Sequence, residues 1–355
     1  MKFWVGIWFC CLAYGAAAQT DAEVSVVPPQ RKYDSIRAIN IKPYPDHFFV
    51  WPVIKQRRLD FEMEDLPARD RKIAYRSNRP YGFGLGVYLF EVAAELTFSI
   101  PVDEKQKDLY GESKARDLQL NMLGKQWGLD VYSQKYQGFY IDDPSAKVPA
   151  GKPYPQRPDI TTHNLGFTGN YVFNNKKFSF RSAYNFADRQ LRSAGSFLLF
   201  TSISSFKAQG DSAILGKHYQ SEFGGDSGIE QIKSTTFAIA PGYTYSLIQR
   251  GFFLNGTLAV GPAHNWLYYR LENGGTLNDI KFSAFIVGRI AMGYSGDRFF
   301  GGLSFVTQNS TAQFDHVKLT SSTGTFKILF GYRFKEFGIL KKRVRDLPRA
   351  LGLGS

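Results

Sequence analysis

The chain has 355 residues, of which 16% are aromatic and 34 are glycine, and its formal net charge is +13 at pH 7. After the N-terminus it holds no apolar run of about 18 residues, which excludes membrane-spanning helices but not membrane-spanning strands. The only two cysteines, Cys10 and Cys11, lie near the start, so the rest of the chain forms no disulfide and no cysteine-based metal site.

The first residues, MKFWVGIWFCCLAYGAAAQT, are typical of an export signal. Lys2 is followed by an apolar stretch, and Ala16-Ala17-Ala18 provide a small-residue cleavage site before Gln19. We therefore expect a signal peptide over residues 1–18 and an N-terminal linker over 19–45. An exported chain rarely meets nucleic acid, so the basic charge favours outer-membrane lipids, lipopolysaccharide or small anionic solutes as partners.

From residue 46 to 335 apolar and polar residues alternate between turn residues, a pattern that predicts β-strands. The thirteen predicted strands cover 48–63, 81–90, 92–100, 115–123, 127–139, 161–173, 177–187, 194–206, 232–247, 251–269, 279–294, 298–308 and 325–335. One more weak strand within 212–223 would bring the total to fourteen, and twelve is the alternative if the first strand lies outside the barrel. Within the strand at 232–247, Pro241 predicts a bulge or local bend.

The connections between these strands alternate in length, as they do in outer-membrane barrels with short periplasmic turns and long external loops. Short turns are expected at 90–91, 124–126, 174–176, 248–250 and 295–297, and long loops at 65–80, 101–114, 141–160, 270–278 and 309–324. Aromatic residues gather at strand ends, as in the aromatic belts of membrane proteins. We predict an all-β fold: a transmembrane antiparallel up-and-down β-barrel of about 12–14 strands over 46–335, followed by a basic tail, 336–355.

Three stretches carry a resemblance to a known family: YRSNRPYGFGLGVYLFEVAAELTFSIP, LQLNMLGKQWGLDVYSQKYQGFYI and RQLRSAGSFLLF. They resemble landmarks of domain of unknown function 4421 (DUF4421), a family of outer-membrane-barrel-like bacterial proteins, from about Tyr33 to Lys335. The resemblance implies a β-barrel in the outer membrane of a Gram-negative cell, and it implies neither an activity nor functional residues. Ordinary outer-membrane barrels usually finish at an aromatic C-terminal residue. Here Phe334 ends the last predicted strand, but twenty-one residues follow it.

A search for reactive constellations finds no catalytic motif, and no cofactor is expected. The five histidines show no H-x-x-x-H or H-E-x-x-H spacing, so the sequence predicts no metal site. A barrel-embedded lipid-modifying enzyme would need a serine beside a histidine at the rim, and His163 with Ser179 or Ser182 is the nearest arrangement. We interpret His163 as an ordinary rim residue and expect no enzyme.

Seven charged side chains are predicted to point into the lumen, five of them positive. Two interpretations stay open: a paired network that fills the lumen, since buried charges need partners, or an anion-favouring pore. We predict a passive pore or a structural membrane component with a net basic lumen; a soluble exported β-protein, with the face of Phe83, Leu85 and Val87 covered by protein, is the other alternative. The lumen residues are Glu95, Asp130, Arg181, Lys281, Arg289, Lys327 and Arg333.

Overall fold

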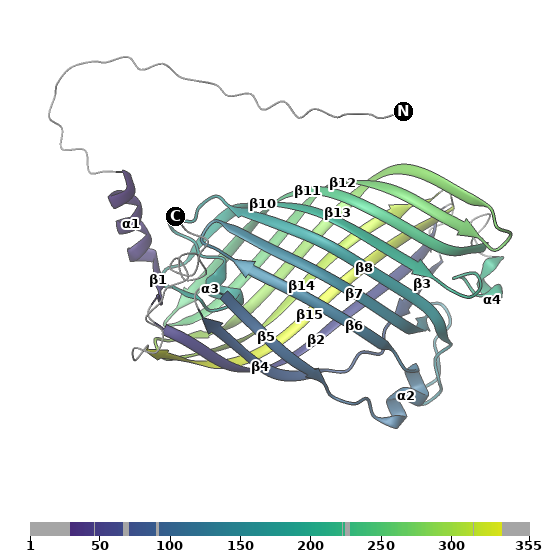
Figure 1. Cartoon of the computed structure of the whole chain (residues 1–355), viewed down its shortest axis with the longest axis horizontal. Helices are drawn as coiled ribbons and strands as arrows, with labels where there is room; N and C mark the ends of the chain where they lie inside the picture. Colours follow the sequence, from purple (N-terminus) through teal and green to yellow (C-terminus); the bar gives the residue numbers. More distant parts are fainter. Residues whose placement is uncertain are drawn as a thin grey trace, which may run out of the picture.

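The computed structural model describes residues 29–45, 47–66, 71–89, 92–221, 223, 228–314 and 316–335. They form an elongated antiparallel β-barrel with tilted strands (Figure 1). The expected signal peptide 1–18, the basic tail 336–355 and the short turn at 90–91 lie outside the described residues. None of the described helices is long and apolar enough to cross a membrane.

One sheet of thirteen strands forms the barrel wall. Ten of them close into a ring, in which β15 pairs with β2 and β3 joins β2 to β7. The predicted all-β antiparallel barrel is confirmed, and the expected 12–14 strands agree with the sheet but exceed the closed ring. The wall strands are β2 (His47–Asp65), β3 (Lys72–Arg76), β4 (Gly82–Leu89), β5 (Val92–Ser99), β6 (Lys114–Leu123), β7 (Trp127–Asp142), β8 (Gln156–Val172), β10 (Ala194–Gln209), β11 (Ile229–Gln249), β12 (Phe252–Leu271), β13 (Thr276–Ser295), β14 (Phe299–Gln313) and β15 (Val317–Lys335).

The ring is smaller than the sheet because the wall is organised differently along its length. At the short-turn end β4 pairs with β2, β5 pairs with β4, and β6 pairs with β7. In the described part of the chain β5 and β6 make no ladder with each other, so this half of the wall contains every strand except β3 and has one unpaired seam. Nearer the long loops, β3 fills the space between β2 and β7, and the ring is closed.

The outward side chains around the seam are apolar and face the surroundings of the barrel. Phe83 and Leu85 on β4 are 52% and 58% exposed, and Leu118 on β6 is 74% exposed. Val87 is also exposed. No described residue therefore covers the face of Phe83, Leu85 and Val87, which a soluble protein would have to bury. A surface of this kind is stable only against lipid. The barrel is therefore transmembrane, and the soluble alternative is wrong.

Aromatic side chains form a belt on the outside of the short-turn end, as the sequence predicts. Cross-strand contacts join Trp127 to Tyr171, Phe197 to Tyr243, Phe252 to Tyr294 and Phe299 to Tyr332. The turns beneath the belt are short. Arg250 and Gly251 both have positive φ angles, 51° and 89°, which is the geometry of a tight two-residue hairpin between β11 and β12.

Several local predictions are wrong. The segment 177–187 is not a strand but contains a short helix, α3 (Arg181–Tyr184), and 212–223 holds the helix α4 (Lys217–Gln220) rather than a strand. Pro241 causes no bulge, because the β11–β12 register is the same before and after it, although the pairing of residues 239–241 with 260–262 is interrupted.

The connection lengths also differ from the prediction. The expected long loops at 270–278 and 309–324 consist mostly of strand residues, and the expected loop 65–80 contains β3. The expected short turn at 174–176 belongs instead to a long connection between β8 and β10.

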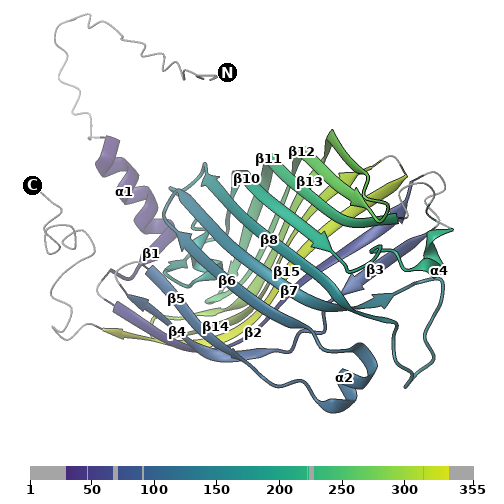
Figure 2. The ribbon, with the colours of Figure 1, turned by 45° about the vertical axis from the view of Figure 1, so that its right-hand side comes forward.

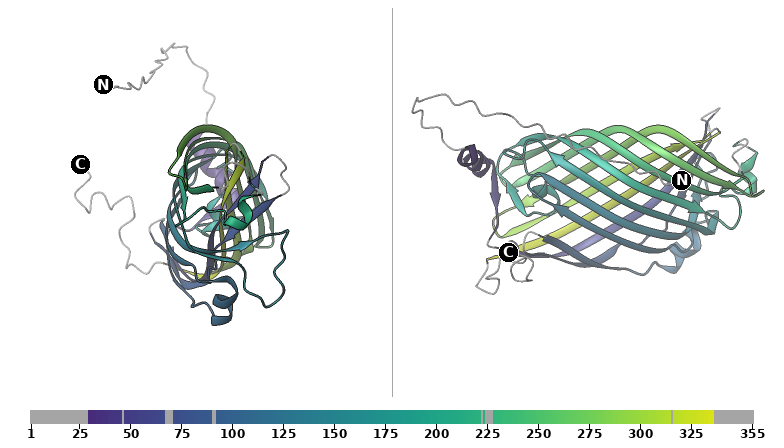
Figure 3. Two further views of the ribbon diagram at one scale, coloured as in Figure 1. Left: turned by 90° about the vertical axis from the view of Figure 1, so that its right-hand side faces the viewer. Right: turned by 45° about the horizontal axis from the view of Figure 1, so that its top comes forward.

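The remaining elements lie at the two ends of the barrel (Figures 1, 2 and 3). The described part of the expected linker contains α1 (Pro29–Asn40) and β1 (Ile41–Pro43), at the short-turn end. There β1 pairs with β9 (Asp188–Gln190) in a separate two-stranded sheet. The helices α2 (Glu104–Tyr110) and α4 lie at the opposite end, among the long loops.

Candidate functional site

The short-turn end of the lumen is filled by residues 174–190, which we call the plug. Phe178, Phe180 and Phe186 are 0%, 2% and 3% exposed and pack in one hydrophobic cluster with inward side chains of the wall. The Tyr184 hydroxyl donates to Asn255 Oδ1 on β12 at 2.8 Å. Because these aromatic rings occupy the centre of the barrel, the plug blocks the lumen at this end.

A buried carboxylate holds the plug to the N-terminal helix. Asp188 is 0% exposed and accepts hydrogen bonds from Ser179 Oγ at 2.6 Å and from Arg181 Nε and Nη2 at 3.0 and 2.9 Å. It also accepts from Arg37 Nη2 on α1 at 3.0 Å, and Arg37 donates further to the Asn175 carbonyl. Two arginines thus share one carboxylate, which links α1, α3 and β9.

Arg333, near the end of β15, joins the plug to the wall. Its guanidinium donates to the carbonyl oxygens of Gly296 at 2.6 Å and Phe186 at 2.9 Å. The same group lies over the rings of Tyr44 and Phe300, at 4.3 and 4.6 Å from their centroids. Arg333 is 2% exposed, so it is a structural anchor of the plug and does not line an open channel.

A more exposed ion pair fastens β1 to the β13–β14 turn. Asp297 Oδ1 accepts from Lys42 Nζ at 2.7 Å, from Arg189 Nη1 at 3.0 Å and from the Tyr44 hydroxyl at 3.2 Å. The hydrogen bond from Lys42, together with the positive charges of Lys42 and Arg189, lowers the pKa of the Asp297 carboxyl although partial burial opposes the shift.

The long-loop end of the lumen is closed by a second hydrophobic cluster. Ile214 and Leu215, which precede α4, are both 0% exposed and pack there with inward residues of the wall. The Tyr75 hydroxyl and Arg157 Nη1 each donate to the Ile214 carbonyl at 2.7 Å. The segment therefore folds back into the barrel mouth rather than extending the sheet.

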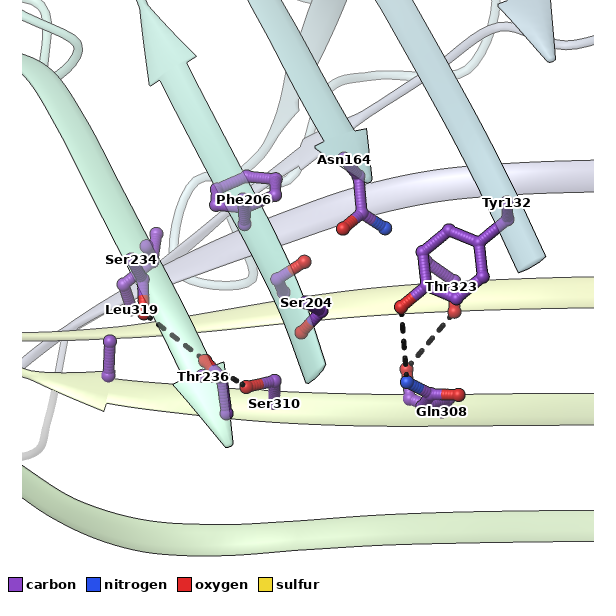
Figure 4. Close-up of a pocket in the computed structure, with 12 residues that line it drawn as sticks. Tyr132, Asn164, Ser204, Phe206, Ser234, Thr236, Gln308, Ser310, Leu319 and Thr323 are labelled. Atoms are coloured by element: carbon purple, nitrogen blue, oxygen red, sulfur yellow. Dashed lines mark hydrogen bonds between the residues drawn. The ribbon is translucent and has the colours of Figure 1, made fainter. Parts of the chain in front are cut away.

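Between the two clusters lies a narrow polar zone. Its cavity has a volume of about 20 Å³, enough for about one water molecule. Figure 4 shows side chains from opposite walls meeting across this cavity. Gln308 Nε2 donates to the Tyr132 hydroxyl at 3.3 Å, and the Thr236 and Ser310 hydroxyl oxygens are 3.5 Å apart. The described side chains thus leave little open space at this level of the lumen.

A charged space lies inside the wall beside β5 and β6, and we call it the side cavity. Its volume is about 260 Å³. Two plug residues, Tyr184 and Asn185, line it, together with apolar residues such as Val306. It is lined by four cationic and two anionic side chains: Lys55, Arg57, Arg289, Lys327, Glu95 and Asp130.

Glu95 on β5 is the centre of one charge group in the side cavity. Lys55 Nζ on β2 lies 2.5 Å from Glu95 Oε2, and Lys327 Nζ on β15 lies 3.1 Å from Oε1. Trp51 Nε1 also donates to Glu95 at 3.3 Å, and Lys327 donates to the Tyr184 carbonyl at 3.3 Å. Two lysines therefore share one carboxylate, with their side chains 11% and 17% exposed.

Asp130 and Arg289 form the second charge group, across the cavity from the first. Arg289 Nη2 donates to Asp130 Oδ2 at 2.9 Å, and Asp130 also accepts from the Asn121 side chain. The guanidinium lies over the rings of Phe180 and Phe200, 5.3 Å from each centroid. Its Nε is buried without a hydrogen-bond partner, which leaves one donor of this cation unused.

The structure brings together four of the seven residues predicted to line the lumen: Glu95, Asp130, Arg289 and Lys327 all border the side cavity. Arg181 was expected on a strand but belongs to α3 in the plug, and Arg333 anchors the plug. Lys281 lies on β13 outside the side cavity, 2.8 Å from Asp279. The paired-network interpretation thus describes the observed contacts, although it stays a prediction for function.

Sequence reasoning missed the cations of β2. Lys55 and Arg57 share a face with Trp51 and Leu59 at a period of two, and Arg57 Nη1 pairs with Asp117 at 2.8 Å. The alternation places these residues on one face, but it does not show which face points inward, because apolar residues occupy both faces of this strand. Because plug and loop clusters make the lumen apolar at each end, the rule of polar-inside strands does not identify the inner face of β2.

The serine–histidine arrangement considered from the sequence does not form. His163 lies on the exposed face of β8, whereas Ser179 and Ser182 are buried in the plug. Their hydroxyls donate to Asp188 at 2.6 Å and to the Ser179 carbonyl at 2.7 Å, respectively. Within the described ranges, no group of three or more His, Cys, Asp or Glu residues is placed to hold a metal ion.

Comparisons with known proteins concern the whole barrel. Among solved structures, the translocator domain of autotransporter NalP from Neisseria meningitidis is 8% identical, with 86% of this chain and 94% of that chain covered and a TM-score of 0.32. OmpT, an outer membrane protein of Vibrio cholerae, is 9% identical, with 81% of this chain and 98% of that chain covered and a TM-score of 0.26. Ail, the attachment invasion locus protein of Yersinia pestis, is 15% identical, with 59% of this chain and 97% of that chain covered and a TM-score of 0.22. These similarities are too low to transfer any property.

No curated protein matched the chain. A family model did match it, from residue 33 to residue 334, which covers the described barrel from α1 to the end of β15 and confirms the resemblance carried by the three sequence stretches. The chain belongs to the family described as domain of unknown function DUF4421.

Proposed function

We propose that this protein is a structural component of the cell outer membrane whose lumen is closed by its own chain. The apolar outer face and the aromatic belt support insertion in a bilayer, and the short turns are expected on the periplasmic side. Outer-membrane lipids and lipopolysaccharide are then its immediate surroundings. The observation that carries the proposal is that hydrophobic clusters fill both ends of the barrel around a central cavity of about 20 Å³.

The runner-up is the passive pore predicted from the basic lumen. Its support is the excess of cations in the side cavity, which favours anionic solutes. A pore requires a continuous aqueous path, however, and Phe178, Phe180 and Phe186 occupy the position that such a path would need. We therefore assign conduction only to a barrel from which the plug has been displaced.

Planar-bilayer recordings test this function. The purified protein is first checked for heat-modifiable migration, the sign of a folded barrel, and is then compared with a variant in which residues 178–189 are replaced by a Gly/Ser linker of equal length. We expect no steady conductance from the natural protein and an anion-preferring conductance from the variant. Steady conductance through the natural protein would reject the closed barrel and favour the passive pore.

A further inference from the structure

The unpaired edges of β5 and β6 need an explanation in a membrane. Exposed strand edges are unfavourable in hydrocarbon because their N–H and C=O groups have no water to bind. β5 pairs only with β4, and β6 only with β7, in the described chain. We propose that this seam is a lateral entrance, through which a single-chain amphiphile with a carboxylate or phosphate head group passes from the bilayer into the side cavity.

The position of the side cavity supports a lateral route. Ala93 and Ala94 of β5 and Gln119 and Leu120 of β6 border both the seam and the cavity. No other wall strand separates the cavity from the outside at this point, as the order of the strands in the sheet requires. The view of β4, β5 and β6 in Figure 2 shows the β4–β5 hairpin and β6 as neighbouring parts of the wall. A head group entering between β5 and β6 thus reaches the charges directly.

The charges of the cavity specify the head group. Four cations and two anions line it, and although Asp117 neutralises Arg57 from outside the cavity lining, a cationic excess remains. Arg289 is 6% exposed, yet its Nε has no partner. An anionic head group in the cavity can accept from the two lysines that now share Glu95, and the spare donor of Arg289 lies in the second charge group of the same cavity. A cationic or neutral head group does not gain the interaction with the lysines.

The seam itself specifies the rest of the molecule. Leu96 and Leu118, on the outward faces of β5 and β6, are 65% and 74% exposed and border the lipid side of the seam. The seam is narrow, because Cα atoms of β5 and β6 approach within 8 Å of each other without forming a ladder. A boundary of this width suits one acyl chain better than two, with the head group in the cavity and the tail toward the bilayer. The site therefore selects a single-chain anionic lipid over a soluble anion.

Trp51 supplies a direct reporter of binding. It lines the side cavity and is 2% exposed, whereas Trp127 and Trp266 are 66% and 47% exposed on the outer surface. Replacing the two outer tryptophans by phenylalanine leaves Trp51 as the emitter of the described barrel. In an uncharged detergent, fatty acids and lysophosphatidic acids brominated close to the head group are expected to quench Trp51 saturably, and the brominated alcohol at least about tenfold more weakly. The two acids distinguish a carboxylate from a phosphate ligand.

Charge variants separate recognition from simple destabilisation. Lys55→Gln and Lys327→Gln are each expected to raise the half-quenching concentration about tenfold, whereas Lys233→Gln, at an exposed position on β11, leaves it unchanged. Glu95→Gln removes the competing carboxylate and is expected to lower the half-quenching concentration. A merely damaged barrel does not bind more tightly. Absence of saturable quenching, or equal quenching by acid and alcohol, would overturn the proposal.

The entrance is tested by locking the seam. Ala94 and Leu120 are replaced by cysteine and joined by oxidation, or by a bis-maleimide linker where the sulfurs lie too far apart for a disulfide. The lock is expected to slow quenching at least about tenfold, and reduction of the disulfide restores it. Unchanged quenching kinetics in the cross-linked protein would reject lateral entry. Because the readout is fluorescence and not current, it is independent of whether the lumen conducts.

Discussion

Replacing Asp188 by asparagine removes the negative charge that two buried arginines share. Arg37 and Arg181 are 7% and 4% exposed, so water cannot compensate for the loss. Breaking a buried ion pair by neutralising one partner typically costs about 3–5 kcal/mol. The hydroxyl of Ser179 also loses a charged acceptor at 2.6 Å, but the amide oxygen of asparagine replaces part of that bond.

The apolar contacts of the plug decide whether it stays docked when the Asp188 charge is removed. Burial of a phenylalanine side chain contributes about 1.5–3 kcal/mol, so Phe178, Phe180 and Phe186 together hold the plug with at least about 4 kcal/mol. This is comparable with the cost of Asp188→Asn. We therefore expect the plug to stay docked most of the time but to open roughly a hundredfold or more often, since each 1.4 kcal/mol is a factor of about ten.

Hydrogen exchange followed by mass spectrometry measures this opening. Peptides that cover 178–190 are expected to exchange at least about a hundredfold faster in Asp188→Asn, while wall strands such as β12 keep their protection. Asp279→Asn is the matched control, because the Asp279–Lys281 pair is about one-third exposed and such pairs contribute at most about 1 kcal/mol. Equal plug protection in Asp188→Asn and the natural protein would refute the role assigned to this carboxylate.

Three further predictions concern other parts of the barrel. Because the pKa of Asp297 is lowered, its pairing with Lys42 stabilises the docking of β1 at pH values above the ordinary aspartate pKa. This stabilisation is lost as the pH falls through the lowered pKa. Limited proteolysis near residue 41 should therefore accelerate in acid, and the acceleration should be smaller in Asp297→Asn. Arg333→Lys keeps the charge but loses the paired donors to the carbonyls of Gly296 and Phe186. We expect the free energy of unfolding, measured by thermal unfolding, to fall by about 2 kcal/mol. An unchanged melting temperature would contradict the anchoring role. Leu118→Arg places a charge on the lipid face and is expected to cost about 2–4 kcal/mol in refolding titrations into vesicles, whereas Lys114→Arg, at the strand end, should cost less than about 0.5 kcal/mol.

Much of the wall was predictable because its determinants are local. The hairpin of β6 and β7 shows this well: Leu118, Leu120 and Met122 alternate with polar residues and are all exposed on the lipid side. The turn at 124–126 is closed by a hydrogen bond from Gly124 N to Trp127 O at 2.7 Å. Period-two alternation and turn residues are read within ten residues of sequence, and the bilayer requires the apolar face to point outward.

The plug was not predictable by the same argument. FSFRSAYNFA, residues 178–187, alternates large apolar and smaller residues, and this pattern suits a wall strand as well as a segment buried in the lumen. Only the surrounding barrel distinguishes them, because Asn255, Arg333 and Asp188 supply the partners that the segment needs inside. The candidate charges had the same ambiguity: Arg181 was expected on a wall strand but belongs to α3 in the plug.

By itself, the sequence determined that this protein is a membrane barrel, which residues of most strands face lipid, and where the short turns near 124–126, 248–250 and 295–297 lie, since these properties depend on neighbours along the chain. The tertiary structure decided which strands close the ring, that no ladder joins β5 to β6 among the described residues, and which charges meet in the side cavity. These features depend on contacts between distant segments: Lys327 and Glu95 are 3.1 Å apart in space although most of the barrel separates them in the chain. Alternation specifies the face of a strand, but not its partner across the lumen.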